Sequence, residues 1–201
     1  QRRCGERGQH RAWLRTGVLF AVPVAATYWI AWFGLEHVPH LADETAYWFQ
    51  ARIFAAGRLW APVPALPEFF RHDHILMLGD RWLAKYPPLF PLLLSLGMRV
   101  GLPWMVNPVL AGFTALGVFR LAAGWRGRRA GWLAWLLLVS SPFYLMMGAN
   151  LMAHMAAATF LLWFTIWGQE TLNTGRLSKA LATGLALGAA ILTRPFTALL
   201  Y

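Results

Sequence analysis

Acidic side chains are concentrated in one part of this chain, the polar stretch from residue 36 to residue 80. Six of the eight carboxylates lie there: Glu36, Asp43, Glu44, Glu68, Asp73 and Asp80. A positioned carboxylate can act as a general base that takes a proton from a hydroxyl group. Adjacent residues of a helix point about 100° apart, so only one acid of the pair Asp43-Glu44 can face a given reacting atom. We predict that Asp43 acts as the base and that Glu44 supports it.

Two cations stand where they could meet an anion. Lys85 opens the segment Lys85-Tyr86-Pro87-Pro88, which closes the acidic stretch just before an apolar run. A lysine held by rigid prolines at the depth of lipid headgroups can bind a phosphate as a point charge. Arg194 lies within an otherwise apolar segment, where an arginine is costly unless it faces a polar cavity or an anion. The two residues therefore predict an anion-binding site.

Each of these residues also has an ordinary structural use. Asp43 could cap the N-terminus of a helix, and Glu44 could be a favourable charge in its first turn. Lys85 could be a snorkelling anchor, with Tyr86 in the interfacial belt of aromatic residues. The sequence leaves both pairs of interpretations open.

Histidines recur in the same stretch, notably in His72-Asp73-His74. Histidine and aspartate are zinc ligands, but no cysteine and no second tight pair completes a recognisable ligand spacing. We therefore expect no metal site and no cofactor, and we interpret His72 and His74 as substrate contacts or solvated loop residues.

Composition indicates an integral membrane protein. Hydrophobic residues make up 58% and charged residues 13% of the 201 residues, which is too apolar for a soluble domain of this size. The net charge of +10 comes from short basic clusters beside apolar runs, at residues 2–15, 120–129 and 176–179. That distribution is the positive-inside pattern of a membrane protein and argues against a nucleic-acid partner. It predicts a multi-pass protein of the plasma (inner) membrane with a cytoplasmic N-terminus.

Apolar runs that are long enough to cross the bilayer predict the membrane topology of the chain. The expected spans are residues 13–35, 104–124, 130–148, 153–167 and 180–200. Residues 36–87 form an extracytoplasmic loop, in which residues 44–56 are expected to be an interfacial helix ended by Gly57. The run 89–102 is short and contains Pro91, so we expect it to be interfacial or re-entrant. We expect one module over residues 1–201, the N-terminal part of a longer protein.

The order of these motifs resembles that of a known family. The acidic motif Asp43-Glu44-x-x-Tyr47 follows a first span, and Lys85-x-Pro87-Pro88-Leu89 closes the loop. A basic turn at residues 126–129, a span ending near Ser141-Pro142, and Thr193-Arg194-Pro195 then follow in the same order. The whole resembles the GT-C glycosyltransferases of the protein O-mannosyltransferase and aminoarabinose-transferase group.

The resemblance implies an all-α polytopic membrane enzyme, a GT-C-type transmembrane helix bundle whose first extracytoplasmic loop carries juxtamembrane helices. Such enzymes transfer a sugar from a polyprenyl-phosphate donor to an acceptor hydroxyl of a protein, lipid or glycan at the extracytoplasmic face. The resemblance implies that Asp43 is the base, that Glu44 is the second acid of the catalytic pair, and that Lys85 binds the phosphate of the donor. We expect the other substrate contacts at Tyr47, Tyr86, Arg194, His72 and His74.

One departure from the family pattern concerns the outer end of the third crossing. Many relatives carry an acid there, whereas this chain has Asn150 and His154. Two other classes of protein stay open on the sequence alone, a polytopic transporter and a non-catalytic membrane scaffold. Broken helices and the intramembrane Arg194 could belong to a transporter. Transporters, however, place charge near the bilayer midplane and usually show repeated halves, whereas here the acids lie at the surface and no repeat is visible in the sequence.

Overall fold

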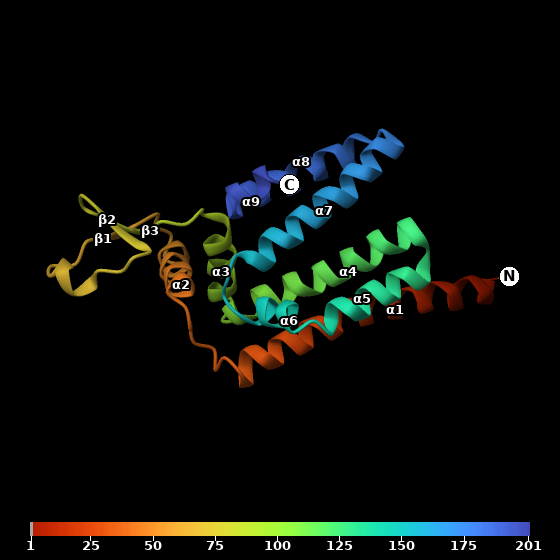
Figure 1. Cartoon of the computed structure of the whole chain (residues 1–201), viewed down its shortest axis with the longest axis horizontal. Helices are drawn as coiled ribbons and strands as arrows, with labels where there is room; N and C mark the ends of the chain where they lie inside the picture. Colours follow the sequence, from red (N-terminus) through yellow and green to blue (C-terminus); the bar gives the residue numbers. More distant parts are fainter. Residues whose placement is uncertain (1) are drawn as a thin grey trace.

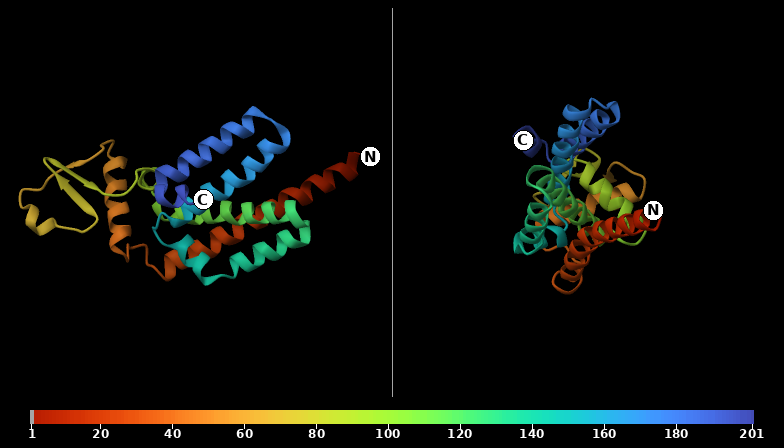
Figure 2. Two further views of the ribbon diagram at one scale, coloured as in Figure 1. Left: turned by 45° about the horizontal axis from the view of Figure 1, so that its top comes forward. Right: turned by 90° about the vertical axis from the view of Figure 1, so that its right-hand side faces the viewer.

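The structure is a computed structural model that describes residues 2–201, with side chains described from Leu14 onward. Five long helices lie side by side along one axis: α1 (Arg2–Phe33), α4 (Val106–Arg126), α5 (Arg128–Val139), α7 (His154–Thr174) and α8 (Leu177–Thr193) (Figure 1). The N-terminus and the α4–α5 and α7–α8 turns share one end of this bundle (Figure 2). The basic residues at 126–129 and 176–179 therefore lie at the same end.

The opposite end carries the polar stretch. Helices α2 (Ala42–Ala55) and α3 (Leu89–Arg99) pack on each other across that end, transverse to the long helices (Figure 1). Beyond them projects an antiparallel sheet in the order β1-β3-β2, formed by Ala61–Pro62, Arg81–Ala84 and Ile75–Leu78. Two 3₁₀ turns, Pro67–Phe70 and Pro103–Met105, complete this region. The mainly helical class is confirmed, while the small sheet is an addition to the all-α expectation.

Two helical segments are long and apolar enough to cross a membrane, Leu14–Phe33 and Pro103–Arg126. A third is added if α5 and α6 (Pro142–Ala149), which are bent by 67° relative to each other, count as one broken span. About 20 apolar residues are needed to cross the hydrocarbon core, so these segments identify a membrane protein.

Two of the expected continuous spans are broken in the structure, both immediately before a proline. Residues 130–148 divide at Ser141, and residues 180–200 divide at Arg194, after which α9 (Pro195–Leu199) begins. The residue before proline is driven out of the helical region by contact with the proline ring. Ser141 and Arg194 accordingly have extended ψ angles of 118° and 85°.

Small residues let α1, α4 and α6 approach closely. Gly148 of α6 faces Thr27 of α1 and Ala111 of α4, both of which are fully buried. The Tyr144 hydroxyl donates to the Ala111 carbonyl at 2.7 Å, and Trp135 Nε1 donates to the Leu19 carbonyl at 3.0 Å. Close backbone approach at small residues is the usual packing mode of helices in lipid.

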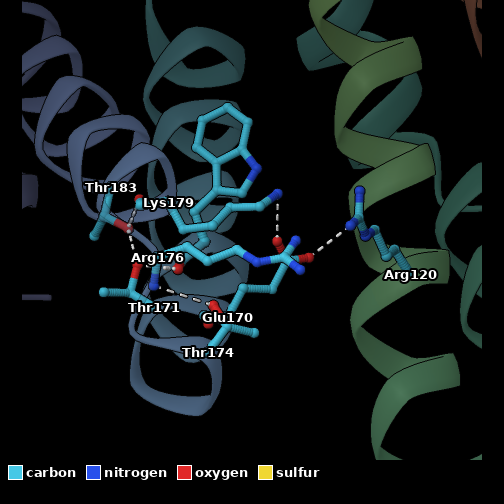
Figure 3. Close-up of polar contacts among 8 residues, drawn as sticks. Arg120, Glu170, Thr171, Thr174, Arg176, Lys179 and Thr183 are labelled. Atoms are coloured by element: carbon cyan, nitrogen blue, oxygen red, sulfur yellow. Dashed lines mark hydrogen bonds and ion pairs between the residues drawn. The ribbon is translucent and has the colours of Figure 1, made fainter.

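An ion network closes the bundle at the end away from the sheet (Figure 3). Glu170 of α7 accepts from Arg120 of α4 at 2.5 Å and from Lys179 of α8 at 2.6 Å. The hydroxyls of Thr171 and Thr183 add a 3.3 Å bond between α7 and α8. One carboxylate thus joins three helices.

We predict that Gly148→Ala destabilises the bundle whereas Gly184→Ala does not. A Cβ at Gly148 would stand 2.6 Å from Cγ2 of the buried Thr27, while a Cβ at Gly184 meets nothing within 4 Å. Overpacking costs about 1 to 3 kcal/mol, and alanine in an open helical position gains up to about 1 kcal/mol over glycine. Thermal unfolding in detergent can be followed by tryptophan fluorescence. The midpoint temperature should fall for Gly148→Ala and rise for Gly184→Ala. Equal shifts would contradict the close packing at Gly148.

Candidate active site

The polar end of the molecule is assembled on α2. The buried Gln50 donates through Nε2 to the Leu59 carbonyl at 2.9 Å and accepts from the Ala84 amide at 2.9 Å. These two bonds fix strand β3, and with it Lys85 and Tyr86, against the helix. No motif in the sequence marks Gln50, because its role depends on partners that are distant along the chain.

Helix α2 begins two residues earlier than the capping interpretation of Asp43 requires. Leu41 occupies the N-cap, and Asp43 is the second helical residue, so the interpretation of Asp43 as the cap is wrong. The C-terminal expectation is confirmed. Gly57 has a φ of +74°, its amide donates to the Phe54 carbonyl, and the next amide donates to the Ile53 carbonyl, which is the Schellman pattern.

The Asp43 carboxylate is about one-third exposed, at 36%, and is bonded by two side chains from the far end of the loop. The Tyr86 hydroxyl donates to Oδ1 of Asp43. The Nε2 atom of His74 lies 3.0 Å from the same oxygen. Three segments that are separate in the sequence therefore meet at one carboxylate oxygen.

Glu44 is turned to a different environment. Its side chain is only 2% exposed and accepts from the backbone amides of His40 at 2.7 Å, Leu41 at 3.4 Å and Leu151 at 3.2 Å. The first two amides lie immediately before α2, and the third belongs to the connection between α6 and α7. Glu44 thus ties α2 to the bundle while Asp43 faces the loop, as expected for two adjacent helical acids.

A cavity of about 390 Å³ lies beside Asp43. Its lining includes Tyr47 of α2, Lys85 and Tyr86 of the loop, and Arg194 at the α8–α9 break. Over the part of the chain whose side chains are described, neither Lys85 nor Arg194 forms an ion pair, and no carboxylate lines this cavity. Two cations without an acidic partner make the cavity a candidate anion site.

Both tyrosines of the cavity remain protonated hydrogen-bond donors at neutral pH. Burial raises the pKa of Tyr47 to about 12, against an opposing effect of the Arg194 charge. Burial also raises the pKa of Tyr86, and its hydrogen bond to Asp43 raises it further. The Tyr86 hydroxyl therefore keeps the proton that it donates to Asp43.

A groove of about 560 Å³ shares Arg194 with this cavity. Its walls are mostly apolar, with Ala157, Ala158, Leu161 and Leu162 of α7, and His154 stands at its edge. Arg194 and Thr197 line both hollows. The cationic side chain of Arg194 thus belongs both to the cavity that contains Lys85 and to an apolar groove.

The expected site residues divide into two groups in the structure. Asp43, Tyr47, Lys85, Tyr86 and Arg194 surround or adjoin the cavity, with His74 bonded to Asp43. His72 does not line this cavity. It lies in an exposed hollow with Glu68 and Arg71, and its Nδ1 accepts from the His74 amide at 3.1 Å. Among residues 14–201 no three His, Cys, Asp or Glu side chains are placed to hold a metal ion together.

No protein-family model, no curated protein and no solved structure matches this chain.

We predict that Glu44→Gln lowers the stability of the protein more than Asp43→Asn does. Glutamine keeps one acceptor oxygen, but its amide group would face buried backbone N–H groups that it cannot satisfy. An unsatisfied buried donor costs about 1 to 3 kcal/mol, whereas Asp43 is partly exposed to water. Thermal unfolding of the two variants in the same detergent measures the difference. Equal midpoints would show that Glu44 does not hold α2 on the bundle.

Proposed function

We propose that this chain is the catalytic module of a membrane glycosyltransferase of GT-C type, which transfers a sugar from a polyprenyl-phosphate donor to an acceptor hydroxyl at the extracytoplasmic face. One observation carries the proposal. Lys85 and Arg194, which are far apart in the sequence and have no acidic partners among the described side chains, line one cavity with Tyr86, which donates to Asp43. A phosphate site thus adjoins a candidate base.

The shape of the surroundings suits an amphiphilic donor. Lys85 offers a compact charge and Arg194 a planar fork of donors, which are complementary ways of binding phosphate oxygens. The apolar groove beside Arg194 would accept an isoprenoid chain while the phosphate stays in the cavity. A free sugar phosphate would leave that groove without a role.

In the proposed reaction Asp43 takes the proton of the acceptor hydroxyl, and the acceptor oxygen attacks the sugar carbon that carries the phosphate. The bond between that carbon and the phosphate oxygen breaks, and the lipid phosphate leaves with the bonding electron pair. Positive charge on Lys85 and Arg194 stabilises the leaving group, so no second acid is needed. A single displacement of this kind inverts the sugar carbon.

The proposed orientation follows from the two ends of the bundle. If the basic turns at 126–129 and 176–179 are cytoplasmic, α2, α3 and the sheet are extracytoplasmic (Figure 1). In this proposal the transverse α3 stays in the interface, α1, α4, α7, α8 and the broken span α5–α6 cross the membrane, and the N-terminus is cytoplasmic. The acceptor is a hydroxyl of a protein, a lipid or a glycan, which meets the site from outside the plasma membrane.

A transporter is the rival class, and the arrangement of charge argues against it. Transporters bind substrate near the bilayer midplane between repeated halves. Here Asp43, Lys85 and Arg194 lie at the end of the bundle covered by α2 and α3.

The orientation can be tested with single cysteines in a protein whose Cys4 is replaced by serine. We predict that Asp73→Cys reacts with a membrane-impermeant thiol reagent in intact cells, whereas Arg128→Cys reacts only after the membrane is permeabilised. Reaction at position 128 in intact cells would overturn the proposed orientation.

The activity is tested with full-length protein in membranes and labelled polyprenyl-phosphate sugars. Lys85→Gln should raise the KM for the donor by on the order of 10- to 100-fold, since a charged hydrogen bond to phosphate is lost. Asp43→Asn should leave donor binding intact and lower kcat by about 10² to 10⁴. The exposed Asp80→Asn is the control and should transfer normally. Transport of the intact donor, with no transfer by the unaltered protein, would contradict the proposal.

A further inference from the structure

His74 and Tyr86 share one oxygen of the Asp43 carboxylate. The Nε2 atom of His74 lies 3.0 Å from Oδ1, and the Tyr86 hydroxyl donates to that same atom. An ionised carboxylate only accepts hydrogen bonds, so Nε2 must carry a hydrogen and act as a donor. The Nδ1 atom of His74 is buried and has no partner among the described residues, so it carries the lone pair more readily than an unsatisfied N–H.

The backbone fixes His74 at this position independently of its ring. Its amide donates to His72 Nδ1 at 3.1 Å, and its carbonyl accepts from the Lys85 amide at 3.1 Å. His74 and Lys85 directly adjoin the paired ends of β2 and β3, where Ile75 stands opposite Ala84. The side chain that bonds the candidate base is therefore joined, through one backbone hydrogen bond, to the candidate ligand of the phosphate.

Because the bonds from Tyr86 and His74 both fall on Oδ1 of Asp43, the other oxygen, Oδ2, is left for a substrate proton. We infer that His74 is a positioning residue: its Nε2–H holds Oδ1 so that Oδ2 faces the acceptor hydroxyl. Tyr86 shares this task, but it also lines the phosphate cavity. His74 is 24% exposed and does not line that cavity, so its contribution can be separated from donor binding. This inference rests on the proposed transferase activity.

The test compares a variant of His74 that removes the hydrogen-bond donor to Asp43 with one that keeps such a donor. His74→Leu removes the N–H, and we expect kcat to fall about 10- to 100-fold with the KM for the lipid donor unchanged. His74→Gln places an amide N–H at the same number of bonds from the backbone, and it should recover most of the rate. Loss of activity in both variants, or a rise in donor KM without a fall in kcat, would overturn the positioning role.

A double-mutant cycle separates action through Asp43 from a general structural effect. If His74 works only through the carboxylate, His74→Leu should cause no further loss in the Asp43→Asn background. A full additional loss would overturn the inference. Matching thermal midpoints for His74→Leu and the unaltered protein establish that the variant folds.

A spectroscopic readout does not need turnover. Nitrogen NMR of the labelled protein should show His74 protonated at Nε2 and hydrogen-bonded, and Asp43→Asn should shift that signal. An Nδ1-protonated ring would overturn the inference outright. If the signal behaves as expected but the unaltered protein transfers no sugar, the proposed function fails, and with it the role of the pair in transfer. Normal transfer by His74→Leu would instead refute the positioning role alone.

Discussion

The polar end of this molecule depends on the opposite orientation of two adjacent acids. On α2, Glu44 is buried among backbone amides, while Asp43 faces the loop and receives Tyr86 and His74. The helical twist between neighbouring residues makes this division possible. One carboxylate fixes the helix to the bundle, and the other gathers the loop residues around the cavity.

The attachment of α2 to the bundle matters because the segment that it contacts there, the connection between α6 and α7, is not helical. Between α6 and α7, residues 150–153 have buried backbone groups that need partners. Glu44 accepts from the Leu151 amide, and Asn107 of α4 donates to the carbonyls of Asn150 at 2.6 Å and Met152 at 2.9 Å. These side chains satisfy backbone groups of the connection that no helix provides for.

The proposed chemistry uses the same framework. Gln50 fixes β3 on α2, β3 leads into Lys85, and the proline at 195 interrupts the apolar segment so that Arg194 leaves the helical conformation and lines the cavity. The proposed base and phosphate ligands thus sit on backbone segments that are each held by buried hydrogen bonds or by a proline. Such support is what a site needs to keep reacting groups in place.

Local chemistry let the sequence predict much of the fold. Apolar length indicated that α1 and α4 contain segments long enough to cross a membrane, the glycine at 57 ended α2, and the residue types pointed to Asp43, Lys85 and Arg194 as candidate site residues. The breaks before Pro142 and Pro195 were also encoded locally, although length alone suggested continuous spans. What only the tertiary structure decided was pairing: that His74 and Tyr86 meet at one oxygen of Asp43, that Glu44 bonds Leu151, and that the loop folds as a small sheet. Those contacts join residues far apart in the chain, and their geometry depends on how whole helices pack, which no local pattern specifies.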